Sequence, residues 1–191
     1  MDYFDILLHR PGTLIWAAAL SGLLAMALLG LYAWRRYINR HPVACVLKRL
    51  GALYVRNLVV PDGVGGTIQT DFLVLLRGGV LVLDVKNYRG VLFGSENAPL
   101  WSQMIKSRSY KFANPLPENV FRVQSVQQLL PGVPVSGRVV FTRDAQFPRD
   151  IPAGVSMLDT LVEDLGIFAG TASLQYLDAW KRLCQVGEAS R

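Results

Sequence analysis

An uncharged apolar segment near the N-terminus constrains this chain more than any other feature. Residues 14–34 read LIWAAALSGLLAMALLGLYAW, and Ser21 is the only strongly polar side chain among these 21 residues. At about 1.5 Å per residue, a helix of this length covers the roughly 30 Å hydrocarbon core of a bilayer. Trp16 lies near one end and Tyr32 and Trp34 near the other, where aromatic rings favour the membrane interfaces. We therefore expect a single transmembrane helix over residues 14–34.

The charges on either side of this segment predict its orientation. Arginines at 35, 36 and 40 follow it, whereas the short flank 1–13 holds one arginine against two aspartates. The positive-inside rule then places the N-terminus outside and the rest of the chain in the cytoplasm. A cleaved signal peptide would need a basic start, a shorter apolar run and a small-residue cleavage site. A buried core helix is the other alternative. We expect a single-pass protein of a bacterial inner membrane.

Composition narrows the class of the remaining chain. The length of 191 residues suits one domain and an accessory segment. Two cysteines are too few for a disulfide-stapled scaffold or a four-cysteine zinc site, so a reduced compartment is expected. Two histidines exclude a His-rich metal centre and disfavour a Ser-His-Asp site. A hydrophobic fraction of 51% with 18% charged residues argues against disorder.

The pattern after the apolar segment predicts the order helix, three strands, helix, strand. Turn-forming and apolar runs place these elements at residues 43–53, 54–60, 67–76, 80–85, 118–130 and 135–142. A Gly78–Gly79 turn would join the second and third strands. Smaller elements are expected at residues 91–93, 155–158, 161–168 and 174–186. We assign residues 35–46 to a basic juxtamembrane linker, residues 47–142 to the core, and residues 143–191 to a C-terminal extension of the same domain.

Two aspartates interrupt apolar strands and form the candidate site. Asp71 lies within TIQTDFLVLL, and Asp84 follows four apolar residues in VLVLDVKN, with Lys86 two positions later. Because strand side chains alternate, Asp84 and Lys86 share a face. Pairing across the Gly78–Gly79 turn would place Asp71 opposite Lys86 and within one diagonal of Asp84. Three ionisable groups should therefore converge at one sheet edge.

Two carboxylates and a lysine suit metal-assisted phosphodiester hydrolysis. Carboxylate oxygens bind Mg²⁺, which retains several waters and accepts phosphate oxygens. The metal lowers the pKa of its bound water, and an ammonium group orients or activates the attacking water. The alternative is a structural ion pair between Lys86 and Asp71 or Asp84 at the end of a buried strand. The residues alone leave both interpretations open.

Several ordered motifs resemble the NERD family, the nuclease-related domain. The resemblance is carried by PDGVGGTIQTDFLVLLRGGVLVLDVKNYRGVLFGSE at 61–96, Trp101, and FANPLPENVFRVQSV at 112–126. Its most specific parts are IQTD at 68–71, VLDVKN at 82–87, YRG at 88–90, Gly94 and NPL at 114–116. The resemblance spans about residues 47–142. Members of this family look like divergent relatives of the PD-(D/E)xK phosphodiesterases.

The resemblance implies a fold and a set of roles. The fold would be α/β, of the α+β type, with a restriction-endonuclease-like αβββαβ core preceded by a single transmembrane helix. Asp71 and Asp84 would bind Mg²⁺ or Mn²⁺, and Lys86 would be the catalytic lysine. Gln69 and Asn87 would be neighbours of the site. The implied function is to bind nucleic acid and hydrolyse its phosphodiester bonds.

One departure from the family pattern keeps a second function open. The family often has a Gly-Glu pair in its first helix, whose carboxylate completes the acidic set. Residues 35–61 of this chain contain no Asp or Glu. The alternative is therefore a catalytically degenerate module that tethers nucleic acid or a protein partner at the membrane.

A basic and aromatic segment lies close to the predicted site in sequence. Lys106, Arg108 and Lys111 are interleaved with Tyr110 and Phe112 in a cytoplasmic part whose net charge is +7. Cationic side chains contact phosphates and aromatic rings stack on bases, so this segment is a candidate nucleic-acid-binding surface. A solvated loop over residues 101–117 is the alternative.

Two polar residues open the predicted helix at 118–130. We expect Glu118 and Asn119 to occupy its first turn, where an acid complements the helix dipole. This role is preferred to a catalytic one. Asn114 precedes Pro115, which favours an extended turn before the helix.

Overall fold

The computed structural model describes residues 11–40, 42–166 and 170–189, and it divides the chain into two units, residues 1–42 and 43–191. The first unit contains α2 (Pro11–Arg40), a helix of 30 residues that includes the whole predicted segment 14–34. Its large apolar side chains between Leu20 and Trp34 are exposed. Among the described residues, none of the helices combines the length and apolar character that a membrane crossing requires. The first ten residues of the predicted flank 1–13 lie outside the described residues.

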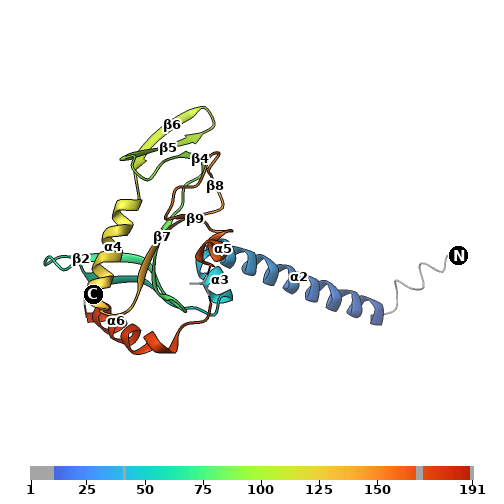
Figure 1. Ribbon diagram of the computed structural model, residues 1–191. Helices are drawn as coiled ribbons and strands as arrows, with labels where there is room; N and C mark the ends of the chain where they lie inside the picture. The colour runs from blue at the N-terminus through green and yellow to red at the C-terminus, as the bar shows by residue number, and fades with distance from the viewer. Residues whose placement is uncertain (1–10, 41, 167–169, 190–191) are drawn as a thin grey trace. The chain divides into compact units, whose positions relative to one another are not determined.

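A five-stranded sheet forms the centre of the second unit (Figure 1). Its strand order is β1-β2-β3-β7-β9. The first three strands pair antiparallel, and β7 and β9 continue the sheet in parallel with β3. The strands are β1 (Leu53–Pro61), β2 (Thr67–Leu76), β3 (Gly79–Lys86), β7 (Val135–Phe141) and β9 (Val155–Met157).

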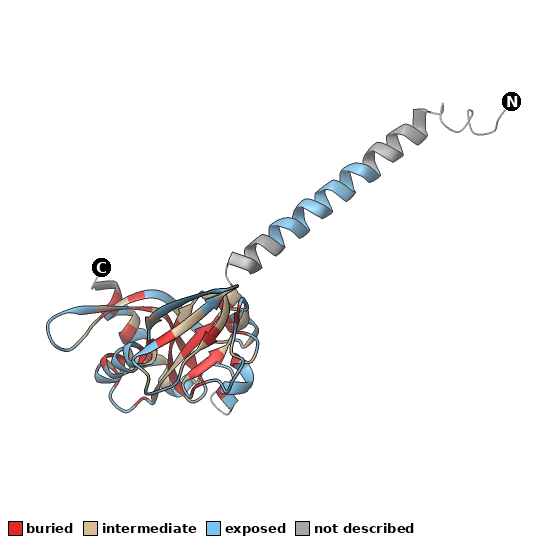
Figure 2. Cartoon of the chain, turned by 90° about the horizontal axis from the view of Figure 1, so that it is seen from above, coloured by how far each residue is buried: buried red, intermediate tan, exposed pale blue. Residues whose placement is uncertain are grey.

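Helices cover both faces of this sheet, which explains the continuous apolar run of its central strand. Leu81 and Leu83 of β3 pack with the cluster that includes α3 (Pro42–Arg49) and α5 (Leu161–Leu165). Val80 and Val82 point to the other face and pack with the cluster that includes α4 (Leu116–Leu129) and α6 (Leu177–Ala189). The short 3₁₀ helix η2 (Leu174–Tyr176) precedes α6. Figure 2 shows the buried residues concentrated in the strands. A strand buried on both faces needs apolar residues at every position, as predicted.

A second sheet replaces the loop that one interpretation expected at residues 101–117. Its order is β6-β5-β4-β8, formed by β4 (Gly90–Phe93), β5 (Leu100–Ile105), β6 (Arg108–Ala113) and β8 (Ala145–Gln146). Trp101 is fully buried, and its ring stacks on Phe141 with centroids 6.1 Å apart. Only the base of the β5–β6 hairpin is buried, so most of its residues are polar and the apolar alternation of a half-buried strand is missing. The loop interpretation was therefore wrong.

The order of the core elements agrees with the αβββαβ prediction. The elements α3, β1, β2, β3, α4 and β7 follow one another, and β4, β5 and β6 are inserted between β3 and α4. The result is a mixed α/β fold with two sheets. The C-terminal residues after 143 contribute β8 and β9 to these sheets, and α5 and α6 to their faces. The end of the predicted helix 161–168 lies outside the described residues.

The turn between β2 and β3 is one residue earlier than predicted. Leu76 pairs with Gly79, so the turn consists of Arg77 and Gly78. Gly79 belongs to β3 with φ of 134°, and a side chain there would collide with the carbonyl of Pro134. The amide of Val80 donates to that same carbonyl at 2.9 Å. The close approach of Pro134 therefore requires glycine inside the strand. With the turn one residue earlier, each residue of β2 faces a residue of β3 two positions before the predicted one.

Candidate functional site

Asp71 and Asp84 lie side by side across the β2–β3 pair. The ladder runs from Leu76–Gly79 to Phe72–Leu83, and one step further along it Asp71 is opposite Asp84. The prediction that Asp71 faces Lys86 was wrong, because the turn is earlier than expected. Asp84 is fully buried, and Asp71 accepts a hydrogen bond from the Val85 amide at its Oδ2, at 2.7 Å. Both carboxylates share the sheet face that α4 covers, since they alternate in step with Val82.

Arg122 of α4 is the ion-pair partner of Asp84. Its Nη1 lies 2.7 Å from Asp84 Oδ2, and its Nη2 lies 2.7 Å from Glu118 Oε1. Its Nε donates to the backbone carbonyl of Gln69 at 2.9 Å. The guanidinium thereby connects β2, β3 and the first turns of α4. Glu118 and Arg122 are four residues apart, a spacing that brings side chains together on one helix face.

Lys86 pairs with Glu118 rather than with an aspartate. The Lys86 Nζ lies 3.5 Å from Glu118 Oε2, and the two side chains are 24% and 54% exposed. The predicted structural ion pair of Lys86 with Asp71 or Asp84 is therefore not formed. An ion pair of this length with one half-exposed partner contributes little to stability, so the ammonium group can exchange this contact for another at small cost.

Burial dominates the electrostatics of Asp84. Desolvation raises the pKa of Asp84, and Arg122 and Asn119 oppose this shift without cancelling it. The nearby charge of Asp71 adds to the increase. Asp84 Oδ2 is held by Arg122, whereas Oδ1 is buried and has no hydrogen-bond partner among the described residues. The Asn119 side chain, whose hydrogen bonding lowers the pKa of Asp84, also donates to the carbonyl of Val82 at 3.5 Å.

The charged forms of Glu118 and Arg122 are stabilised by the charges next to them. Burial raises the pKa of Glu118, but the charges of Arg122 and Lys86 outweigh burial, so the pKa is lowered. Burial lowers the pKa of Arg122, but Asp84 and Glu118 outweigh it, so the pKa is raised. Glu118 therefore remains an anion and Arg122 a cation at neutral pH.

The start of α4 differs from the sequence expectation. Glu118 lies in the first turn as predicted, but its carboxylate bonds to Arg122 and Lys86, and the N-cap residue Pro115 makes no side-chain cap. Asn114 caps the start of the helix instead, because its Oδ1 accepts a hydrogen bond from the Leu116 amide at 3.0 Å. Glu118 is thus a member of the site's ionic network.

Gln69 and Asn87, the two predicted neighbours of the site, form hydrogen bonds to the elements around it. Gln69 contributes its backbone carbonyl to Arg122, and its side chain is exposed. Asn87 Oδ1 accepts a hydrogen bond from the Thr142 hydroxyl at 2.8 Å. This contact joins the residue after β3 to the residue after β7.

The acidic residues fit a small metal site with two protein ligands. The described part of the chain contains no cluster of three or more His, Cys, Asp or Glu side chains that could hold a metal ion. The first helix, α3, supplies buried Val43, Ala44 and Leu47 and no carboxylate. Mg²⁺ is commonly bound by one or two carboxylates together with waters and substrate phosphates. Asp84 and the neighbouring Asp71 are the two carboxylates that could take this role.

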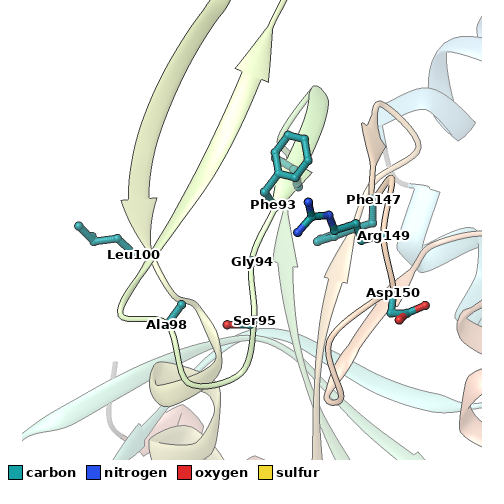
Figure 3. A pocket seen from close by; sticks show the side chains of 9 residues that line it. Phe93, Gly94, Ser95, Ala98, Leu100, Phe147, Arg149 and Asp150 are labelled. Carbon is teal, nitrogen blue, oxygen red and sulfur yellow. The ribbon is translucent and has the colours of Figure 1, made fainter.

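Two hollows lie near the second sheet and α4. One, of about 290 Å³, is lined by Phe93, Leu100, Phe147 and Arg149 among others, and Figure 3 shows the Arg149 guanidinium pointing toward Phe93. It shares no residue with the ionic network. The other, of about 770 Å³, runs beside α4 with mainly apolar walls and shares Asn119 with the surroundings of Asp84. Neither hollow contains Asp71, Asp84 or Lys86.

Sequence reasoning did not identify Arg122, and it gave Glu118 a capping role. The spacing of these two residues in ENVFR was the available signal, because Glu and Arg four apart pair on a helix. That spacing alone predicts a surface ion pair. Only the packing of α4 on β3 shows that the same arginine reaches Asp84.

The mixed α/β fold brings two strand-borne aspartates and a lysine to one edge of the five-stranded sheet. In a comparison with known families, residues 35–142 match NERD, the nuclease-related domain. Because this match covers more than half of the chain, the protein belongs to the NERD family. The predicted resemblance is confirmed.

A curated relative extends the comparison to one further sequence. An uncharacterized protein of Bacillus anthracis is 32% identical over 100 residues, which make up 51% of this chain and 47% of the relative. The chain therefore spans about half the length of the curated relative that it matches.

Proposed function

We propose that this domain binds nucleic acid and hydrolyses its phosphodiester bonds with Mg²⁺, within a restriction-endonuclease-like core. The observation that carries the proposal is Asp84, whose buried Oδ1 accepts no hydrogen bond from the part of the chain that the structure describes and whose carboxylate lies near that of Asp71. An unpartnered buried carboxylate oxygen is costly, and a cation bound there would relieve that cost. Membership of the NERD family supports a nuclease-related function.

Each residue of the site has a role in this proposal. Asp71 and Asp84 would hold the metal, which supplies a Lewis acid and a nucleophilic water at neutral pH. Lys86 can leave its 3.5 Å contact with Glu118 to orient the attacking water or bind a phosphate oxygen. Arg122, fixed by three hydrogen bonds, presents a positive charge beside the carboxylates where negative charge develops on the phosphate.

The second candidate is a degenerate module that tethers nucleic acid or a protein partner without cleaving it. Two observations favour it. The first helix of the core, α3, carries no acidic residue. Arg122 already pairs with Asp84 through Oδ2 and neutralises its charge. In this case the ionic network would be structural, and Mg²⁺ would not change the behaviour of the domain.

We further propose that the segment 14–34 anchors the domain in a bacterial inner membrane, with the N-terminus outside and the domain in the cytoplasm. This proposal rests on the sequence of the segment, because none of the helices in the described residues meets the requirements for a membrane crossing. The support is the uncharged sequence of residues 14–34 and the arginines that follow it. The exposed apolar side chains from Leu20 to Trp34 are of the kind that lipid contact would cover.

A cleavage assay with matched variants tests the catalytic proposal. Full-length protein is incubated with single- and double-stranded DNA and RNA, with and without Mg²⁺, beside the variants Asp84→Asn and Lys86→Met. Asp159→Asn serves as control, because this aspartate is exposed and pairs with Arg143, away from the site's ionic network. We expect Mg²⁺-dependent cleavage that both site variants abolish and the control retains. Cleavage that survives both site variants refutes the assignment, and binding without any cleavage supports the tethering module.

A further inference from the structure

The Glu118 carboxylate contacts both cations of the candidate site at once. Its Oε1 accepts a hydrogen bond from Arg122 Nη2 at 2.7 Å, and its Oε2 lies 3.5 Å from Lys86 Nζ. Each carboxylate oxygen therefore has a different cationic partner. The Glu118 side chain is 54% exposed, whereas those of Lys86 and Arg122 are 24% and 16% exposed. The anion is thus more accessible to solvent than the two cations that it contacts.

The two cations are held in place by contacts other than those to Glu118. Arg122 Nη1 lies 2.7 Å from Asp84 Oδ2, and Arg122 Nε donates to the Gln69 carbonyl at 2.9 Å. Lys86 belongs to β3, whose backbone is paired with β7 as far as this residue. If the Glu118 side chain turns toward solvent, the guanidinium keeps two of its three hydrogen bonds. A preformed pair of cationic donors then remains.

A phosphodiester is the anion that these two donors would accept in place of the carboxylate. It carries one negative charge, as Glu118 does, and it presents two non-bridging oxygens to its partners. Arginine forms the same kind of paired hydrogen bond with carboxylates and with phosphates, and lysine binds phosphate as a point charge. A backbone phosphate can therefore replace Glu118 one charge for another and oxygen for oxygen.

Glu118 competes for the two cations but is not firmly attached to them. Burial raises its pKa, but the charges of Arg122 and Lys86 outweigh burial and lower it, so Glu118 is ionised at neutral pH. Ion pairs with a half-exposed partner contribute little to stability, because water solvates the separated charges. The carboxylate is therefore present as a competitor and can be displaced by a stronger anion.

The cations of the β5–β6 hairpin differ from Lys86 and Arg122 in this respect. Lys106, Arg108 and Lys111 are exposed, and within the described residues none of them forms an ion pair. They belong to the four-stranded sheet and can attract phosphates without displacing an anion. Competition by Glu118 is therefore specific to the positions next to the two aspartates.

We propose that Glu118 occupies, in the free protein, the binding site of a nucleic-acid backbone phosphate on Lys86 and Arg122, and that this phosphate displaces its carboxylate. The inference rests on the proposed nucleic-acid-binding function and names the substrate group that these two cations take. Because Arg122 contacts Asp84 through Nη1 and Glu118 through Nη2, a phosphate in place of Glu118 would lie beside the Asp84 carboxylate.

The first experiment measures binding of the full-length chain, in mild detergent and without divalent metal, to labelled DNA and RNA, single-stranded and duplex. Glu118→Gln removes the charge and keeps the size of the side chain. Glu118→Asp keeps the charge but is one methylene shorter, so it does not span both cations. Glu163→Gln is the control, because Glu163 is exposed on α5, which packs on the opposite face of the sheet from α4. Circular dichroism checks that all variants keep their melting temperature.

We expect Glu118→Gln to bind nucleic acid about threefold to tenfold more tightly than the native chain, because the phosphate no longer competes with a charge-assisted contact. Glu118→Asp should show part of this gain at unchanged net charge. Glu163→Gln should stay within about twofold of the native affinity, because an exposed and distant charge is screened by salt. A gain in Glu118→Gln no larger than that in Glu163→Gln, or native affinity of Glu118→Asp, overturns the inference.

A second experiment asks whether the gain depends on the cation that Glu118 releases. Lys86→Met is introduced into the native chain and into Glu118→Gln. We expect it to weaken binding more in the second background, where Lys86 is available to the phosphate. A gain from Glu118→Gln that persists in full without Lys86 refutes the proposed exchange. Failure of the native chain and of every variant to bind any nucleic acid would instead refute the proposed function itself, so the two failures are distinguishable.

Discussion

At the scale of single residues, the cost of burying the Asp84 carboxylate is opposed by the positive charge of Arg122. Asp84 interrupts a strand that is otherwise apolar, and burial raises its pKa. Arg122 is the compensating group, and it also holds Glu118 and the Gln69 carbonyl. Removing one partner of a buried ion pair leaves an uncompensated charge, which costs more than the pair itself contributes.

The first prediction concerns this pair. Arg122→Met should lower the free energy of unfolding by about 3 kcal/mol at neutral pH, because Asp84 then remains buried without its cation. Chemical denaturation followed by circular dichroism measures this. The double variant Arg122→Met/Asp84→Asn should recover a large part of the loss, since the buried charge is gone. If the double variant is as unstable as the sum of the single variants, the two residues are not coupled.

The pH dependence of the same variant follows from the sign of the pKa shifts. A carboxyl whose pKa in the folded state is above its ordinary value of 3.8 destabilises the fold above that pKa, and the cost disappears as the pH falls through it. The lowered pKa of Glu118 stabilises the native fold above about 4.5 and would be partly lost without Arg122. Both effects make the deficit of Arg122→Met shrink as the solution is acidified.

At the scale of elements, the sequence predicted what depends on local pattern. The strand 67–76 was found at those residues, and the helix 118–130 was found as α4 (Leu116–Leu129). Asp71, Asp84 and Lys86 lie on one face because strand alternation is local. The partner of Asp84 could not be predicted in this way, because Arg122 is 38 residues away and its role depends on how α4 packs on β3.

The second sheet also depends on contacts between distant parts of the chain, which the local sequence pattern does not predict. The strands β5 and β6 have no apolar alternation because Trp101 is the one residue of these two strands that is buried, and it packs against residues that come from other parts of the chain. The register of the β2–β3 hairpin was also missed by two residues, because the close approach of Pro134 determines where Gly79 must lie.

The second prediction tests the core of this sheet. Trp101 contacts Phe112, Phe141 and Phe147, and its indole N–H donates to the Ser95 carbonyl at 3.0 Å. Trp101→Ala should destabilise the protein by about 3 to 5 kcal/mol through the cavity it creates. Hydrogen exchange should increase mainly in β4, β5 and β6. Equal acceleration in β1 and β2 would show that the two sheets unfold as one.

At the scale of the whole molecule, the described residues form the apolar helix α2 and a folded unit that belongs to the NERD family. The third prediction separates them. Residues 43–191 expressed alone should fold with a cooperative thermal transition and remain in solution after ultracentrifugation. The full-length chain should stay with the membrane pellet after an alkaline wash. Release of the full-length chain by that wash would argue against anchoring by α2.

We propose that Asp71 and Asp84 together bind a divalent metal ion, and metal binding can be measured without a substrate. Mn²⁺ titration of the full-length chain, followed by electron paramagnetic resonance, should reveal a site that Asp71→Asn and Asp84→Asn each remove. Lys86→Met and the control Asp159→Asn should retain it. No bound Mn²⁺ at millimolar concentration, or binding that persists in Asp84→Asn, would contradict the account.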